Sequence, residues 1–464
     1  MGLNFPASPS VGALYPQPAI PGVAVYRWDG EKWSLQSLLS KQPIYDDGSI
    51  PMGAQLKLIA PPVAANDAVS KSYVDGIAPP AGTLRYDIDQ TTLSDAQKTQ
   101  SRQNIYAAPL DAMGYFGLQI NGSIDVDQFG LGSVAIANSY IVDQWVGVRS
   151  GTWTGTVARV GDAPPGFASS LKVVVTAGNG SPAPSDYIGL RHYVEGTRIT
   201  RLRWGTVNAQ PLSIAFWAKH HRPGLYSAVV TNQTPSDRGY PFTYTINAAD
   251  TWEYKTVTIP GDTTGTWPTP TALGMNVFFM LAAGTAQSGA PNAWGGWCVA
   301  AVGAINGAQA ATDTFQIAGL VMLPGIELPS ALRAPFVQRH FDDELRACMR
   351  YYEKTYDLGT ALGTATFAGA DFHSLTTTSV GLFGAGGQAG KGFQYRATKR
   401  TTPTVTVYSP QTGAAGKILD GANGTDVNPT IANIGQSGFR WLAGPSAATA
   451  VLSLLAHFSV DARL

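Results

Sequence analysis

The chain has 464 residues with 31 basic and 31 acidic side chains, so its formal net charge is zero. A chain without net charge sets up no overall field that would attract nucleic acid or an anionic membrane, and we expect neither as a partner. Charged residues make up only 13% of the sequence, against roughly 25% in average soluble domains. With 52 glycines and 31 prolines, the composition is typical of a sturdy, β-rich extracellular protein rather than of a cytosolic enzyme.

The two cysteines, Cys298 and Cys348, are too few for a disulfide framework and lack metal-ligand spacing, so we expect buried thiols and no cofactor. The amino terminus lacks the basic and apolar segments of a secretory signal. No apolar run approaches the roughly 20 residues of a membrane helix. We therefore expect synthesis in the cytoplasm without a signal peptide, no membrane insertion, and release from the cell by a route such as lysis.

A β-hairpin is predicted near the amino terminus. Asp29-Gly30 separates two alternating runs, and a two-residue loop there would pair Trp28 with Glu31 and Tyr26 with Trp33. The three aromatic side chains of this hairpin would then share one face. Because a lone hairpin is marginally stable in water, that face either docks on a partner or packs on the segment that follows it in the chain.

Residues 61–112 are interpreted as a Pro-rich connector with short helices. Pro-Pro pairs stiffen it, and one short helical segment is expected between them. Ser94 and Gln97 have the spacing of a capping box, which predicts a helix from there to about Ile105. This helix has almost no apolar stripe, so it depends on neighbours for its stability.

Residues 113–340 are predicted to form an antiparallel, jelly-roll-like β-sandwich. Short apolar or alternating runs recur through this region, separated by Gly, Pro, Asn and Asp, which is the pattern of strands joined by turns. No run places apolar residues convincingly at helical spacing, so two packed sheets are favoured. The clearest strand candidates are Leu171–Val175, Leu212–Trp217, Trp252–Ile259, Val277–Leu281 and Phe315–Leu323.

A helical junction is predicted at residues 341–356. Asp342 and Asp343 open it, and Arg350 and Lys354 lie near its end, as the helix dipole favours. The segment is too short to trimerise the chain and is interpreted as a hinge between two β-domains. Residues 357–464 are rich in Gly, Ala, Ser and Thr with short apolar runs, and they are predicted to form a small all-β domain.

Three segments resemble sequences of bacteriophage tail fibre and tail collar proteins. Asp67–Asp75 is similar to the DAATKAYVD segment of these proteins, and Leu93–Ile105 is similar to their LTEAQKAQARANIGA segment. The hairpin at Tyr26–Trp33 resembles their amino-terminal WDGTKW module. The chain departs from the pattern at Tyr106, where the family usually has Gly, so the end of this helix is expected to differ.

Residues 113–340 resemble the carbohydrate-binding-module-like sandwich of some tail fibres. The resemblance rests on Gln119–Ser123, Trp204–Pro211 and Ala249–Asp262, and continues into the junction, where this chain has Met349 in place of the usual Gln. It extends from residue 1 to about residue 356 and thins beyond.

This resemblance implies a structural virion protein, a homotrimeric tail fibre. Residues 1–60 would attach to phage tail or baseplate proteins, with Tyr26, Trp28 and Trp33 as candidate contacts. The β-domains would point outward and mediate adhesion to the host cell by binding a bacterial surface polysaccharide or another receptor. The domain at 357–464 would lie at the distal end, where a fibre usually meets its host.

Loop tryptophans are candidates for glycan contacts, because sugar rings stack on aromatic side chains through their C–H faces. Trp267, Trp294 and Trp297 lie in Gly-, Pro-, Thr- and Ala-rich stretches typical of loops. The alternative for each is a buried anchor, since large aromatic side chains usually find cover. In the terminal domain the corresponding candidates are Tyr395, Tyr408 and Trp441.

A basic stretch is a further candidate for binding. Residues 191–222 contain six Arg or Lys and one acidic residue, and Arg201 and Arg203 would share a face of the strand expected there. Such a pair would suit anionic sugars or phosphates of an envelope polysaccharide. The alternative is a solvated strand face whose charge is balanced by Asp237 or Glu253.

The sequence contains no catalytic constellation, and we do not expect an enzyme. The six histidines form no HExxH motif, and there is no GxSxG elbow. Glycoside hydrolysis needs two facing carboxylates, but a pair such as Asp250 and Glu253 is explained equally by strand and turn placement. The alternative to an adhesin is a purely structural tail or baseplate component. A polysaccharide depolymerase is less favoured, since the chain shows no long β-helix repeat.

Overall fold

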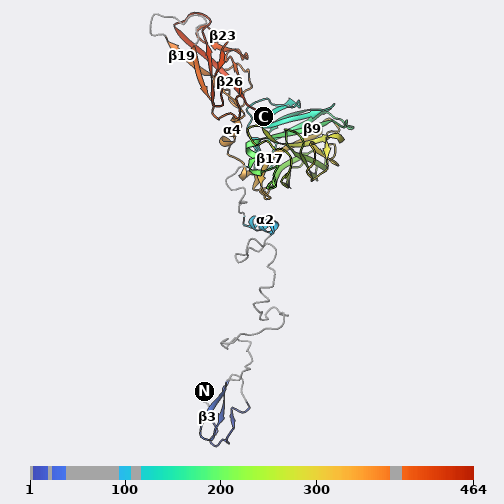
Figure 1. The fold of residues 1–464 in the computed structure, drawn as a ribbon, viewed down its shortest axis with the longest axis vertical. Helices are drawn as coiled ribbons and strands as arrows, with labels where there is room; N and C mark the ends of the chain where they lie inside the picture. The colour runs from blue at the N-terminus through green and yellow to red at the C-terminus, as the bar shows by residue number, and fades with distance from the viewer. Residues whose placement is uncertain (1–3, 19–22, 38–93, 106–116, 377–388) are drawn as a thin grey trace. The chain divides into compact units, whose positions relative to one another are not determined.

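The computed structural model describes residues 4–18, 23–37, 94–105, 117–376 and 389–464 (Figure 1). The chain divides into two units, Met1–Thr83 and Leu84–Leu464. Most of the predicted connector, including its first helical segment, lies outside the described residues. Within those residues, no helix has both the length and the apolar character needed to cross a membrane.

The first unit contains a three-stranded antiparallel sheet of β1 (Leu14–Tyr15), β2 (Val25–Trp28) and β3 (Trp33–Ser37). The predicted hairpin is confirmed, but its predicted register is wrong, because Trp28 pairs with Trp33 and Tyr26 with Leu35. The loop has four residues. The carboxylate of Asp29 accepts hydrogen bonds from the backbone N–H groups of Glu31 and Lys32, both over 2.8 Å, and so closes a wider turn than Asp-Gly alone predicts.

The aromatic face of this hairpin is partly covered by residues that precede it. The Phe5 ring stacks on Trp33 at 5.1 Å between centroids and meets the edge of Tyr26 at 5.2 Å. Tyr15 lies 6.0 Å from Trp33, and Trp28 lies 5.6 Å from the same ring. Tyr26, Trp28 and Trp33 are all half-buried. The face is therefore a small aromatic core in its own right, and its role in tail attachment stays a prediction.

The second unit begins with α2 (Asp95–Asn104), which confirms the helix predicted from the capping box. The hydroxyl of Ser94 accepts from the N–H of Gln97 over 3.3 Å, and the side-chain oxygen of Gln97 accepts from the N–H of Ser94 over 2.9 Å. These two bonds satisfy backbone donors that a helix start otherwise leaves unpaired.

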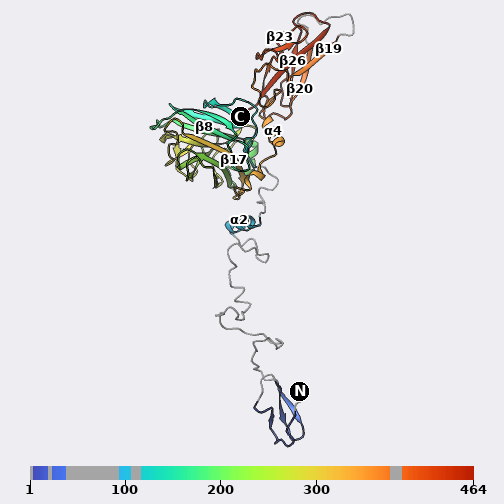
Figure 2. The same ribbon diagram turned by 180° about the vertical axis from the view of Figure 1, so that it is seen from behind.

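The centre of the chain is a sandwich of two six-stranded antiparallel sheets, seen from opposite sides in Figures 1 and 2. The first sheet contains, in spatial order, β13 (Glu253–Ile259), β10 (Leu212–His220), β17 (Thr314–Pro324), β8 (Ser170–Ala177), β7 (Thr154–Val160) and β4 (Val134–Ala135). The second contains β12 (Gly239–Ile246), β11 (Gly224–Thr231), β14 (Leu273–Ala283), β9 (Tyr187–Glu195), β6 (Trp145–Ser150) and β5 (Ser139–Val142).

All five strand candidates coincide with strands, apart from Trp252, which lies one residue before β13, so the prediction of a mainly-β, antiparallel sandwich is confirmed. The inner strands β14 and β17 are covered on both faces and accordingly have continuous apolar sequences. The edge strand β13 alternates between exposed and half-buried residues. The core between the sheets includes the fully buried rings of Trp145, Trp153, Phe216, Phe279 and Phe315.

The carboxy-terminal region is all-β, as predicted, but it begins earlier than the sequence indicates. The helix α4 (Phe341–Met349) stops before the predicted end at residue 356, because β18 (Tyr352–Lys354) pairs with the long strand β26 (Val451–Asp461). The same sheet contains β19 (Asp371–Thr376), β21 (Thr404–Tyr408), β22 (Ile418–Asp420) and β23 (Thr425–Val427). A second sheet of β20 (Ala389–Gln394), β25 (Gly438–Ala443) and β24 (Thr430–Ala432) contributes to the same core.

An ion pair joins the junction to the sandwich. Arg350, directly after α4, donates two hydrogen bonds of 2.8 and 2.7 Å to the carboxylate of Glu195 at the end of β9. Tyr351 donates a third. Burial acts to raise the pKa of Glu195, but these hydrogen bonds outweigh it and hold the pKa below its usual value. Cys298 and Cys348 are buried free thiols, as predicted.

Candidate functional site

The structure places Trp267 in the core of the sandwich, contrary to its prediction as a glycan contact. Its side chain is 7% exposed, and its ring meets that of Trp204 edge-on with 4.6 Å between centroids. The indole Nε1 donates to Asp262 over 3.0 Å, and Asp262 also accepts two hydrogen bonds from Arg238. Trp267 therefore has no free ring face for a sugar.

Trp294 is half-buried and anchors its loop. Its Nε1 donates to the carbonyl of Pro260 over 2.8 Å, and its ring lies 5.2 Å from Trp204 and 5.1 Å from Tyr240. The guanidinium of Arg238 lies 5.7 Å from the same ring. A loop rich in small residues and Pro does not reveal from its sequence that its tryptophan turns inward.

Arg201 and Arg203 do not share a strand face, so this prediction is wrong. The chain leaves β9 and forms two short helical segments, α3 (Gly196–Ile199) and η3 (Thr200–Leu202), after which Arg203 adopts φ = 53°. Ile199 and Leu202 are both buried, which is helical spacing across three residues. A Cβ on Gly196 would lie 2.3 Å from the carbonyl oxygen of Pro268, and this close approach ends the strand.

In the terminal domain, Trp441 is fully buried in the core, contrary to its prediction as a glycan contact. Its Nε1 donates to Asp371 over 3.3 Å. Tyr395 is half-buried and stacks on Phe439 with 6.0 Å between centroids, while Nζ of Lys399 lies 4.9 Å from its ring. Both aromatic side chains serve to pack the domain.

Trp297 remains as the accessible candidate. All eleven tryptophans lie in the described residues, and Trp297, at 37%, has the largest exposed fraction among them. It belongs to a loop that crosses the outer face of the second sheet and contains η4 (Thr285–Gln287), β15 (Ser288–Gly289) and β16 (Ala300–Ala301). Beside this loop, the outward side chains of the sheet form what we call the Trp297 face: Trp297, Phe278, Arg191, Tyr193, Tyr187 and Tyr140.

Phe278 connects Trp297 to Arg191. The Trp297 ring stands at 90° to the Phe278 ring with 6.3 Å between centroids, and the guanidinium carbon of Arg191 lies 5.4 Å from the same phenyl ring. Arg191 also lies 4.5 Å from the ring of Tyr193 and donates a hydrogen bond to its hydroxyl. A guanidinium held between two aromatic rings keeps a fixed orientation.

Two tyrosines of the Trp297 face, Tyr193 and Tyr140, remain neutral. Burial raises the pKa of Tyr193, although the charge of Arg191 acts against it, and burial also raises the pKa of Tyr140. The hydroxyl of Tyr140 donates to the carbonyl of Leu464 over 2.8 Å. Tyr193 and Phe278 are buried, so the exposed indole of Trp297 and the half-buried Arg191 are the groups that could stack on a sugar and bond to its hydroxyl groups.

The sequence contains a signal for this face that the prediction missed. From Tyr187 to Glu195, the odd positions hold Tyr, Gly, Arg, Tyr and Glu, and the even positions hold Ile, Leu, His and Val. This period of two places Tyr187, Arg191 and Tyr193 on one side of β9. The prediction treated the residues from Arg191 onward as one basic stretch and did not use this alternation.

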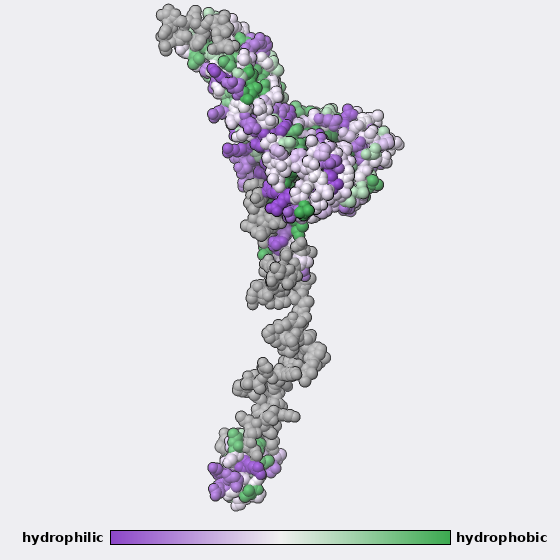
Figure 3. Space-filling model, in the orientation of Figure 1, coloured by the Kyte–Doolittle hydropathy of each residue, from purple (hydrophilic) through white to green (hydrophobic). Residues whose placement is uncertain are grey.

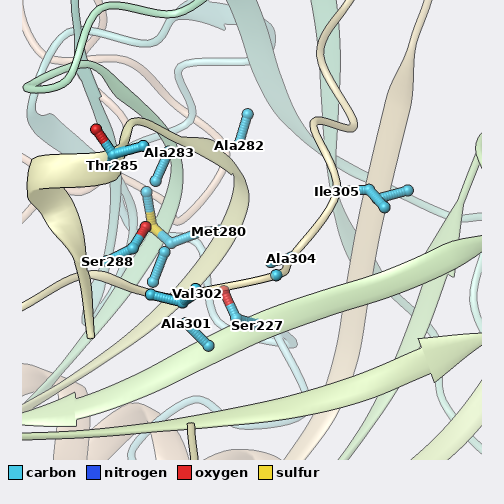
Figure 4. Close-up of a pocket in the computed structure, with 12 residues that line it drawn as sticks. Ser227, Met280, Ala282, Ala283, Thr285, Ser288, Ala301, Val302, Ala304 and Ile305 are labelled. Atoms are coloured by element: carbon cyan, nitrogen blue, oxygen red, sulfur yellow. The ribbon is translucent and has the colours of Figure 1, made fainter. Parts of the chain in front are cut away.

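A small cavity lies under the same loop (Figure 4). It has a volume of about 150 Å³, below the roughly 300 Å³ at which small-molecule sites begin. Figure 4 shows Ser227, Met280 and Ser288 grouped around it, and the remaining walls are mostly alanines and other small residues. Its hydroxyl-bearing residues are Ser227, Thr285 and Ser288, and the volume is too small for a sugar ring with its substituents, so we assign no ligand to it.

The buried acidic side chains of the second unit have ion-pair or hydrogen-bond partners within the fold. The best-defined pairs are Glu195–Arg350, Asp262–Arg238, Asp313–Arg222, Glu344–Arg339 and Glu353–Lys399. Of the two carboxylates weighed as a hydrolytic pair, Asp250 contacts His221 at 3.0 Å, and Glu253 accepts from the N–H groups of Asn247 and Ala248. Among the described residues, no cluster of His, Cys, Asp and Glu could hold a metal ion.

The surface of the sandwich has no extended apolar patch on the side shown in Figure 3, where most residues are white to pale purple and hydrophobic residues are scattered.

No family model matches the chain, and no curated protein matches it.

Solved structures similar to this chain include a phage tailspike domain and several carbohydrate-binding modules. The enzymatically active domain of tailspike protein 4 of bacteriophage CBA120 has 15% identity and a TM-score of 0.25, and the match covers 45% of this chain and 21% of that domain. A family 4 carbohydrate-binding module has 13% identity and a TM-score of 0.24, covering 44% of this chain and 97% of the module. A family 11 module from Clostridium thermocellum, solved with a β-1,3-1,4-mixed-linked tetrasaccharide, has 13% identity and a TM-score of 0.22, covering 43% and 98%.

These values are too low for the activity of any of these proteins to be transferred to this chain. The chain spans about a fifth of the tailspike domain.

Proposed function

We propose that this protein is a non-enzymatic adhesin of a bacteriophage tail, a fibre that contacts a glycan of the bacterial surface through its Trp297 face. The observation that carries the proposal is that Trp297 and Arg191 both lie beside the ring of Phe278, on the outer face of the second sheet. Three segments in the order of tail fibre proteins support a place in the virion, with residues 1–60 on the tail or baseplate. A purely structural tail component is the alternative.

The binding proposal predicts a selective effect of Trp297→Ala. Loss of the exposed indole should weaken binding to bacterial surface polysaccharide about tenfold, which corresponds to roughly 1.4 kcal/mol, because a stacked ring often dominates such contacts. The measurement is biolayer interferometry of the full chain against immobilised polysaccharides and whole cells. Arg191→Ala should act in the same direction.

Trp252→Ala is the matched control. Trp252 is also half-buried and directly precedes β13 of the other sheet, and its Nε1 donates to Asp162 over 3.3 Å. This variant should bind within about twofold of the unchanged chain, since a contact outside the interface contributes little. Equal losses in Trp252→Ala and Trp297→Ala would contradict the proposal, and the absence of any binding would favour the structural alternative. Release of reducing ends from the polysaccharide would contradict the non-enzymatic role.

The tail fibre proposal also predicts a homotrimer. Sedimentation equilibrium of the full chain should give three times the chain mass of 48.9 kDa. A mass of one chain at micromolar concentration would contradict this part of the proposal.

A further inference from the structure

A second pocket lies against the first sheet, on the side of the sandwich opposite the Trp297 face. Its volume is about 410 Å³, within the range of small-molecule sites. The segments at 123–125, 166–168 and 335–341 line it, and η5 (Ala334–Val337) forms part of its wall. Gln338 fixes this wall to the sheet by donating to the carbonyl of Leu320 over 3.2 Å.

Polar groups in this pocket have no partner within the described chain. Ser123 is 3% exposed, and its hydroxyl makes no hydrogen bond. The side-chain oxygen of Gln338 is buried and likewise unpaired. The carboxylate of Asp125 is half-buried and has neither an ion pair nor a hydrogen bond among the described residues. Because buried polar groups in folded proteins nearly always have partners, this arrangement indicates a ligand.

The backbone around these groups is held in a costly conformation. Ile124, between Ser123 and Asp125, has φ = 62°, which is rare for a β-branched residue. Its side chain is fully buried in the core, and its carbonyl accepts a 2.7 Å hydrogen bond from Arg159. The backbone N–H of Asn121 donates to Glu344 over 2.8 Å and fixes the start of the turn. Such strain persists only where its surroundings enforce it, and it is frequent at binding sites.

Apolar rings border the same pocket. Phe336 is 76% exposed and Phe341 is 44% exposed, and both line it together with the half-buried Phe167. Single exposed rings are ordinary, but exposed rings grouped around one pocket are typical of binding sites. The pocket therefore offers stacking surfaces beside hydrogen-bond acceptors.

We infer that this pocket binds one ring of a neutral saccharide. A sugar presents an apolar C–H face to the phenyl rings and a hydroxyl donor to the half-buried carboxylate of Asp125 at the same time. An anionic ligand would be repelled by the unpaired carboxylate of Asp125. Arg339 also lines the pocket, but its guanidinium is paired with Glu344, so a basic peptide side chain is distinguished from a saccharide by the test below. The inference rests on the proposed function because both assign a saccharide as the ligand, but the residues of this pocket are separate from those of the Trp297 face.

The test is saturation-transfer NMR on the full chain with glucose, galactose, mannose and rhamnose, each at about 10 mM, since contacts with a single sugar are typically in the millimolar range. At least one sugar should receive saturation in the unchanged chain and in Trp297→Ala. Phe336→Ala should weaken that binding at least tenfold, and Asp125→Ala should have a similar effect. Because Phe336 is exposed, its replacement by alanine is not expected to unfold the chain. Dispersed methyl resonances in the NMR spectrum of the variant would verify that it is folded.

The outcomes separate this pocket from the Trp297 face. Loss of binding in Trp297→Ala with full binding in Phe336→Ala and Asp125→Ala would overturn the pocket and leave the proposed function in place. Saturation of none of the four sugars would overturn it as well. Saturation transfer to lysine methyl ester that is lost in Asp125→Ala would indicate that the ligand is a basic peptide side chain and not a saccharide. That result would overturn the inference.

Discussion

Replacement of Lys399 by methionine is expected to lower the free energy of unfolding of the carboxy-terminal domain by about 3–5 kcal/mol, the usual cost of leaving one member of a buried ion pair without its partner. The Lys399 side chain is fully buried, and its Nζ lies 2.6 Å from Glu353. The same nitrogen donates to the carbonyl of Met349 over 2.5 Å. One side chain thus joins the end of α4, the strand β18 and the segment before β21.

Methionine fills similar volume but donates no hydrogen bond, so the carboxylate of Glu353 would remain buried with only the backbone N–H of Arg396 as a donor among its present partners. Burial lowers the pKa of Lys399, while Glu353 acts in the opposite direction. Differential scanning calorimetry should show the transition of this domain at least about 10 °C lower, given the usual relation between stability and Tm for a domain of roughly 100 residues.

Lys391→Met is the matched control in the same domain. Lys391 pairs with Asp371 at 2.6 Å, but its side chain is 35% exposed, so solvent screens the pair. Its loss should cost about 0–1 kcal/mol. The double variant Glu353→Leu/Lys399→Met should lose less stability than Lys399→Met alone, because no charge is left unpaired. Similar shifts in Lys391→Met and Lys399→Met would contradict this account.

The parts of the fold that the sequence predicts are those in which local pattern and tertiary environment agree. The run Val277–Leu281 is a strand because an inner strand is buried on both faces and needs apolar residues throughout. The helix at α2 begins where the capping box places it. In both cases neighbours in the chain carry the deciding information.

The errors arise where a contact that the residue pattern does not reveal decides the local structure. The hairpin loop is wider than Asp-Gly predicts because the side chain of Asp29 caps the turn. Arg201 and Arg203 lie outside a strand because Gly196 packs on the backbone of Pro268, a residue far along the chain.

The same reason explains the mixed result for the candidate glycan contacts. Trp267 is buried because Asp262 and Trp204 take its nitrogen and its face, and neither contact is visible in the Gly- and Thr-rich sequence around it. Trp297 lies in a similar stretch but keeps an exposed ring. Arg191 and Tyr193 were recognisable from the alternation along β9, since strand period is a local property.

The last prediction concerns His192, a fully buried histidine on β9 whose two ring nitrogens have no hydrogen-bond partner in the described structure. Its ring lies 4.7 Å from Trp145. Burial, with a smaller effect of Arg198, lowers its pKa from 6.5 to about 3. Above pH 6.5 the residue is neutral in both the folded and the unfolded chain and contributes no pH dependence.

Below pH 6.5 the unfolded chain binds a proton that the folded chain does not bind until its pKa of about 3 is reached. Stability is therefore lost as pH falls through this window, by up to about 1.4 kcal/mol per pH unit. His192→Leu removes this loss and also the two unpaired nitrogens. We expect the variant to be more stable than the unchanged chain by about 1–2 kcal/mol at neutral pH, and by a further 2–3 kcal/mol near pH 4.5.

Chemical unfolding of the sandwich, followed by tryptophan fluorescence at several pH values, measures this difference. His221→Leu is the control for exchanging a histidine for a leucine, because the side chain of His221 is 48% exposed. It should not show the gain in stability near pH 4.5 that is expected for His192→Leu. If His192→Leu and the unchanged chain lose stability in parallel between about pH 6.5 and 4.5, the buried imidazole takes up its proton in the folded state, and the sandwich core must admit water beside Trp145.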